Sequence, residues 1–131
     1  MDISKALGRR IPFASHLGIQ LVEKGSGRCV LTLELREELM NSFEAAHGGV
    51  VMTLLDIAMA MAARSLDPKA VGAITVEMKT SFMGVGKGVL TATGECLHLG
   101  RSVAFCEGKV HNADGKLAAS ASGTFMLRHA K

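Results

Sequence analysis

The residue best suited to chemistry in this sequence is Asp56, a carboxylate within a run of apolar residues. Between Gly49 and Arg64 the only other polar side chain is that of Thr53. Burying a carboxylate is costly unless it gains partners, and carboxylates in such surroundings are common at functional sites. Asp56 is therefore a candidate base or nucleophile, although it could instead only hydrogen-bond to a neighbouring loop or subunit.

A second candidate is the sequence His47-Gly48-Gly49, which directly precedes the apolar run. Glycines at the start of a helix let a ligand approach free backbone N–H groups, and a helix N-terminus favours negative charge. A carbonyl oxygen becomes negative when water attacks the carbonyl carbon, so these N–H groups suit such a hydrolysis. The two glycines could equally serve only to shape a tight turn into the helix.

The spacing of these two candidates implies two subunits. Gly48 and Asp56 are eight residues apart, which corresponds to roughly 12 Å along a helix. One carbonyl group cannot touch both. If Gly48 binds the oxyanion and Asp56 activates the water, the two residues come from different protomers. We therefore expect a homodimer with composite active sites.

The apolar run predicts the helix that positions both candidates. Residues 50–64 are rich in Leu, Met and Ala, which favour helix, and Pro68 opposes its continuation. Because this helix has almost no polar face, the rest of the fold must cover it. The sheet of one subunit should still cover it incompletely, which again favours self-association.

Six strands are predicted to supply that cover. An apolar run at 17–22 and an alternating run at 28–36 precede the helix and are joined by a glycine-rich turn. Four strands follow, at 73–83, 89–99, 103–111 and 116–127. Residues 1–15 form a helical or irregular lead-in. This order predicts a single α+β domain of residues 1–131, in which a six-stranded antiparallel sheet wraps one central helix.

Composition excludes several classes of function. The 131 residues include no Trp or Tyr, and the net charge of +3 comes from scattered Lys and Arg, so no nucleic-acid partner is expected. Cys29, Cys96 and Cys106 lack disulfide or metal spacing, and the histidines lack ligand spacing, so we expect reduced thiols, no metal and a cytoplasmic protein. No apolar segment is long enough to predict a membrane anchor or a secretion signal.

Three parts of the sequence combine into a recognisable motif. Asn41, His47-Gly48-Gly49 and Asp56 reproduce the pattern Asn-x5-His-Gly-Gly-x6-Asp, and the chain resembles the hotdog-fold acyl-CoA thioesterases of the PaaI type. The likeness extends to residues 13–21, 75–82 and 100–104. It implies a hotdog fold and hydrolysis of acyl-CoA to a free acid and coenzyme A (CoA) without a cofactor. It also implies a homodimer that assembles further into a homotetramer.

The resemblance implies roles for individual residues. Asp56 would be the general base or nucleophile, either activating water directly or forming an anhydride first. Asn41 would position the water or the carbonyl group, and Gly48 would supply the oxyanion N–H. His47 would shape or polarise the same pocket, and it is less attractive as the sole base because relatives place their carboxylate at position 56.

Thr75 matches a Ser or Thr that assists the carboxylate in relatives. Simple alternation turns its side chain away from the helix, because Ile74, Val76, Met78 and Phe82 share the apolar face of the strand. A β-bulge could redirect Thr75 toward Asp56, and an ordinary strand threonine remains the alternative.

Other residues are expected to contact the substrate rather than the reacting atoms. These candidates are Gly49, Phe82, Met83, Arg101 and Ser102. The two apolar side chains would line the acyl pocket. Arg101, together with Lys87 or Lys79, would meet the CoA phosphates.

Two other functions fit the same fold. A hotdog hydratase or dehydratase also acts on acyl thioesters, but these enzymes pair a catalytic His with an acidic residue in motifs that this sequence lacks. A non-catalytic acyl-CoA sensor would normally carry a DNA-binding segment, for which 131 residues leave no room.

Overall fold

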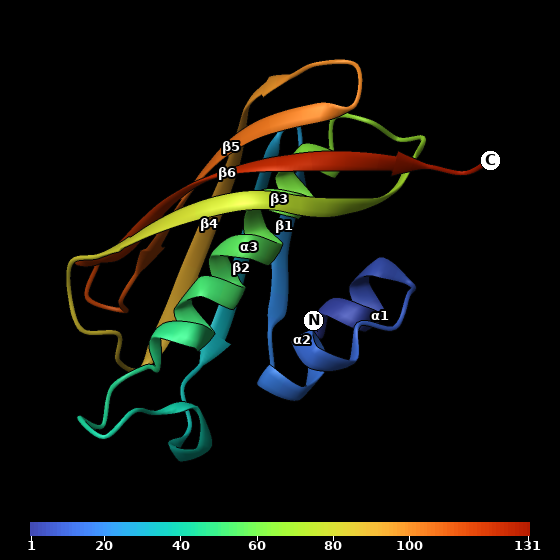
Figure 1. Cartoon of the computed structure of the whole chain (residues 1–131). Helices are drawn as coiled ribbons and strands as arrows, with labels where there is room; N and C mark the ends of the chain where they lie inside the picture. The colour runs from blue at the N-terminus through green and yellow to red at the C-terminus, as the bar shows by residue number, and fades with distance from the viewer.

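One long helix lies against the concave face of a curved sheet in the computed structural model, which describes residues 1–131 (Figure 1). The helix is α3 (Gly48–Arg64). The strands are β1 (Gln20–Gly25), β2 (Arg28–Glu34), β3 (Ala70–Phe82), β4 (Val89–Leu99), β5 (Val103–His111) and β6 (Leu117–His129). All neighbouring strands are antiparallel, in the order β1-β2-β4-β5-β6-β3. The predicted six-stranded α+β fold is confirmed. None of the helices is both long and apolar enough to cross a membrane.

The residues before β1 form two short helices beside that strand, rather than a single lead-in (Figure 1). They are α1 (Ile3–Leu7) and α2 (Pro12–Leu17). Gly18 ends α2 with a φ of 81°, in the left-handed region that glycine adopts without a steric penalty. The prediction of a strand from Leu17 is therefore wrong at its start, and β1 begins at Gln20.

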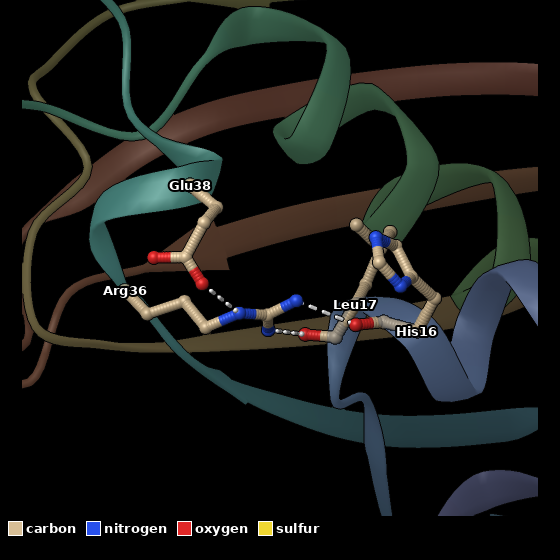
Figure 2. Close-up of polar contacts among 4 residues, drawn as sticks. All are labelled: His16, Leu17, Arg36 and Glu38. Carbon is tan, nitrogen blue, oxygen red and sulfur yellow. Dashed lines mark hydrogen bonds and ion pairs between the residues drawn. The ribbon is translucent and has the colours of Figure 1, made fainter.

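Arg36 fixes α2 against the loop that follows β2, as Figure 2 shows. Its Nη1 and Nη2 donate to the carbonyl oxygens of Leu17 and His16 at 3.0 and 2.6 Å. Its Nε donates to Glu38 at 3.1 Å. The last carbonyls of a helix have no partners inside the helix, so this guanidinium satisfies two of them. The contact also anchors the short 3-10 helix η1 (Glu37–Leu39), where the chain turns toward α3.

Glycines in the sheet let α3 approach it closely. A Cβ atom at Gly94 of β4 would overlap the carbonyl oxygen of Ala58 and lie 2.8 Å from the backbone nitrogen of Met59. A Cβ at Gly108 or Gly123 would lie 3.2 or 3.3 Å from the side chain of Met59. The centre of the helix therefore rests directly on the sheet backbone, where no side chain could fit.

Gly94→Ala is expected to destabilise the fold by about 3 kcal/mol, because the methyl group meets helix backbone, which cannot move aside as a flexible side chain would. The measurement is the free energy of unfolding in denaturant. Gly72→Ala in β3 is the matched control, since a Cβ there has no atom within 4 Å, and it should leave stability unchanged or raise it by about 0.5 kcal/mol. Equal stability of the two variants would contradict the close approach of α3.

One face of α3 remains uncovered by its own chain. Nine residues of the helix are buried. The others recur at intervals of three or four residues, the spacing of one helix face. We call this face the α3 stripe; it consists of Gly48, Gly49, Met52, Thr53, Asp56, Ile57, Ala60 and Arg64. The stripe agrees with the expectation that one subunit covers the helix incompletely.

The edge strand β3 changes faces at a β-bulge. Its pairing with β6 shifts register between Thr75 and Glu77, which exchanges the inward and outward sides of the strand. Ile74 and Val76 are consequently 47% and 57% exposed, and the prediction that they face the helix is wrong. Met78, beyond the bulge, does pack against the core.

Candidate active site

Asp56 lies half-buried on the α3 stripe beside β3. Its Oδ1 accepts a hydrogen bond of 2.5 Å from Thr75 Oγ1, so the bulge does redirect Thr75 toward the helix. The hydroxyl is neutral, and no ion pair of the chain includes Asp56. The carboxylate is thus oriented without being neutralised by a cation, and its second oxygen can accept a proton from water.

The start of α3 leaves one backbone donor free. His47 is the N-cap residue, and its Nδ1 accepts the N–H of Gly49 at 2.9 Å. Val50 and Val51 donate to the carbonyl oxygen of His47 at 2.9 and 3.2 Å. The N–H of Gly48 takes part in none of these bonds. It is the group at this helix end that remains available to a ligand.

The capping bond also decides what His47 and Gly49 can do. A neutral imidazole that accepts at Nδ1 carries its proton on Nε2 and has no second lone pair to act as a base. While the cap is formed, His47 therefore shapes the helix start rather than removing a proton. The N–H of Gly49 is occupied by the same bond, which leaves Gly48 as the donor.

Asn41 holds the loop before α3 and keeps one polar group free. Its Oδ1 accepts from the N–H groups of Phe43 at 2.8 Å and Ala45 at 3.2 Å, and its own N–H donates to the carbonyl of Ala45 at 2.8 Å. The Nδ2 amide makes no bond within the chain, so it can donate to a substrate carbonyl or to water.

Asn41 and Gly48 line the same cavity, which has a volume of about 450 Å³, within the usual size of small-molecule sites. Phe82 joins them, and a Cβ at Gly48 would lie 3.5 Å from its ring. The remaining lining residues are Phe43, Ala45, Ala46, Gly84, Val85, Gly86 and Lys87. The site at the helix start is therefore a largely apolar cavity with two free amide donors.

Phe43 is a cavity residue that the sequence reasoning missed. Its side chain is 83% exposed, although it lines the cavity. The sequence did offer a signal: Phe43 is an aromatic residue in the loop between Asn41 and His47, where it is not needed to fill the core.

One chain does not bring all the candidates together. Met83 does not line this cavity. The turn with Arg101 and Ser102 lies at the other end of the sheet. The Ser102 carbonyl oxygen accepts the N–H of Leu127 on β6 at 2.7 Å. Leu127 pairs with Ala73 of β3, which is nine residues before Phe82, or roughly 30 Å along the strand.

The cysteines do not offer a competing nucleophile at the buried positions. Burial raises the pKa of the Cys29 and Cys106 thiols to about 12, so both stay protonated at neutral pH. No group of three or more His, Cys, Asp or Glu side chains is arranged to hold a metal ion.

Residues 43–119 match the model of the thioesterase superfamily. The chain is 30% identical over 130 residues to acyl-coenzyme A thioesterase 13 of Homo sapiens, covering 96% of this chain and 92% of that protein. It is 30% identical over 108 residues to acyl-coenzyme A thioesterase PaaI of Escherichia coli, covering 81% and 75%.

Solved structures show the same fold. The PaaI protein of E. coli superposes with a TM-score of 0.85 at 25% identity, covering 95% of this chain and 89% of that one. The smu.793 protein of Streptococcus mutans, bound to acetyl CoA, superposes with a TM-score of 0.78 at 25% identity, covering 86% and 90%. The chain has the hotdog fold and belongs to the thioesterase superfamily, with relatives of the PaaI type.

Proposed function

We propose that this protein is an acyl-CoA thioesterase, which hydrolyses the thioester of an acyl- or aryl-acyl-CoA to the free acid and CoA. The observation that carries the proposal is Asp56, held by Thr75 on an open helix face without a cation. Two relatives are named acyl-coenzyme A thioesterases, and a structural relative binds acetyl CoA.

In the proposed reaction Asp56 accepts a proton from water while the water oxygen attacks the thioester carbon. The carbonyl oxygen becomes an oxyanion and accepts the N–H of Gly48. Asn41 donates through Nδ2 to the same oxygen or to the water. The C–S bond then breaks, and the thiolate of CoA leaves and takes up the proton that Asp56 received from water. Direct attack by the carboxylate, with an anhydride that water hydrolyses afterwards, uses the same groups.

The decisive test of this function is incubation of the protein with a panel of acyl-CoAs and detection of the free thiol. Thiol release that depends on enzyme concentration supports hydrolysis. Tight binding of acyl-CoA without thiol release would favour a sensor. A change in the absorbance of an enoyl-CoA substrate without thiol release would favour a hydratase.

We also propose that the active site is shared between two protomers. On one chain, Gly48 and Asp56 are separated by roughly 12 Å of helix. The edge of β3 that faces away from β6 has no strand partner, and exposed apolar side chains flank the bulge on this strand. In a twofold-symmetric dimer, the β3 strand of a second copy could pair with this edge. The second copy would then cover both the edge of β3 and the α3 stripe. Gly48 of the partner subunit would then reach Asp56.

Complementation between two inactive chains is expected if the site is shared. Consider a heterodimer of an Asp56→Asn chain and a Gly48→Pro chain, purified with two affinity tags. One of its sites carries both substitutions and the other carries neither, so the heterodimer should have about half the activity of the wild-type dimer. A site contained within one protomer predicts instead that the heterodimer is as inactive as either homodimer.

Asn41→Asp separates the two roles of Asn41. A carboxylate at this position can still accept the N–H groups of Phe43 and Ala45, so the loop should keep its shape, but the Nδ2 donor is lost. We expect kcat to fall about 10-fold or more while the melting temperature changes little. Asn41→Ala, which loses both roles, should lower stability as well. An Asp variant with wild-type kcat would assign Asn41 to the loop alone.

A further inference from the structure

Arg64 lies on the same open face of α3 as Asp56. The two residues are eight positions apart on the α3 stripe, which places Arg64 roughly 12 Å further along the helix axis. Its Nε atom is buried and has no hydrogen-bond partner in the chain. A buried donor without an acceptor is unfavourable, so we expect this guanidinium to bind an acceptor that the single chain does not supply.

The surroundings of Arg64 are cationic. Burial, and then the charge of Arg9, lower the pKa of Arg64. Burial, and then the charge of Arg64, lower the pKa of Lys24 on β1. None of the three basic residues forms an ion pair. Asp67, the nearest acid in sequence, is already bonded to His129 at 2.6 Å.

Arg9 is held in place by the fold, and Arg64 is not needed to cap the end of α3. Arg9 comes from the connection between α1 and α2, and its Nη1 donates to the carbonyl oxygen of Val71 at the start of β3. The last carbonyls of α3 are already occupied, because Ser65 donates to Met61 and, through its hydroxyl, to Ala62. Arg64 therefore keeps an unpartnered guanidinium donor beside a second arginine, and an anion is the partner that such a group prefers.

We propose that Arg64 and Arg9 form an oxyanion-binding subsite at the far end of the α3 stripe, which binds an anionic group of the thioester substrate. The inference rests on the proposed function, since it takes Asp56 as the position of the thioester. The anionic group is either a phosphate of CoA or a carboxylate at the end of the acyl group, and both match the planar fork of arginine. Lys24 adds positive charge beside this subsite.

Binding of thioether analogues tests the subsite without requiring hydrolysis. Four ligands are compared by calorimetry: an alkyl thioether of CoA, the same alkyl thioether of pantetheine, and the two corresponding compounds with a terminal carboxylate on the alkyl chain. Arg64→Gln should weaken binding about 10-fold, as expected for loss of a charge-assisted hydrogen bond. If the phosphate is bound, both CoA ligands lose affinity and both pantetheine ligands do not. If the carboxylate is bound, only the two carboxylated ligands lose affinity.

Two further variants make the result specific. Arg9→Gln should reproduce the pattern of Arg64→Gln from a different element. Arg10→Gln is the charge-matched control, because Arg10, unlike Arg9, donates no hydrogen bond to β3 and is not among the charges that lower the pKa of Arg64, and it should bind all four ligands like the wild type. Unchanged affinity of Arg64→Gln for every ligand, or an equal loss for all four, would overturn the subsite. If Arg64→Gln shows this ligand pattern relative to the wild type, but the wild type hydrolyses no thioester, the subsite is supported and only the proposed reaction is contradicted.

Discussion

Asp56→Asn is expected to lower kcat by about 10²-fold or more. The asparagine Oδ1 can still accept the hydroxyl of Thr75, so the side chain should keep its position, but the amide nitrogen cannot accept a proton from water. Because the substitution removes an interaction needed for the chemical step, KM should change much less than kcat. The measurement is initial-rate kinetics with the best acyl-CoA of the substrate panel.

The control for this substitution is Thr53→Val, on the same face of α3. Thr53 donates its hydroxyl to the carbonyl of Gly49 at 2.7 Å, so the variant removes a polar group from the stripe without removing a carboxylate. It should retain most of the wild-type kcat. If the Asp56→Asn variant turned over as fast as the wild type, Asp56 would have no part in the chemistry.

Gly48→Pro is expected to lower kcat by about 10²-fold to 10³-fold, the usual cost of removing one oxyanion donor. Proline lacks the N–H group but is favoured at the first position of a helix. His47 has φ of −61° and ψ of 138°, which is the extended conformation required before proline. The substitution therefore deletes the donor with little expected change in the fold.

Gly48→Ala separates the loss of the donor from the added atoms. Alanine keeps the N–H group and places its Cβ 3.5 Å from the ring of Phe82, which is ordinary van der Waals contact. The alanine variant should retain most of its turnover, and its melting temperature should match that of the proline variant. Equal losses of kcat in both variants would indicate a steric effect and contradict the role of the Gly48 N–H.

The extent of the later strands was predictable because turn residues mark their ends. The predicted ranges 89–99 and 103–111 coincide with β4 and β5. The ends of β3 and β6 differ from the prediction by one to three residues, since pairing between these two long strands extends past the local signals. The helix at 50–64 is found with two more residues at its start, the glycines that His47 caps.

The position of Thr75 shows where sequence periodicity fails. Alternation along the strand predicts a side chain that points away from the helix, whereas the bulge before Glu77 turns it toward Asp56. A bulge adds one residue to one strand relative to its partner, so its position depends on the pairing with β6 and not on the sequence of β3 alone.

The apolar helix and the turn residues were enough to indicate the fold and the central carboxylate, and the motif from Asn41 to Asp56 indicated the family by its resemblance to known thioesterases. These features are local in the chain, and each follows from residue type and spacing. Only the tertiary structure decided that Thr75 holds Asp56, that His47 occupies the Gly49 N–H and leaves Gly48 free, and that Arg64 lies unpartnered on the same helix face. Each of these depends on which groups distant elements bring within hydrogen-bonding reach, and side-chain directions and burial are set by that packing rather than by sequence spacing.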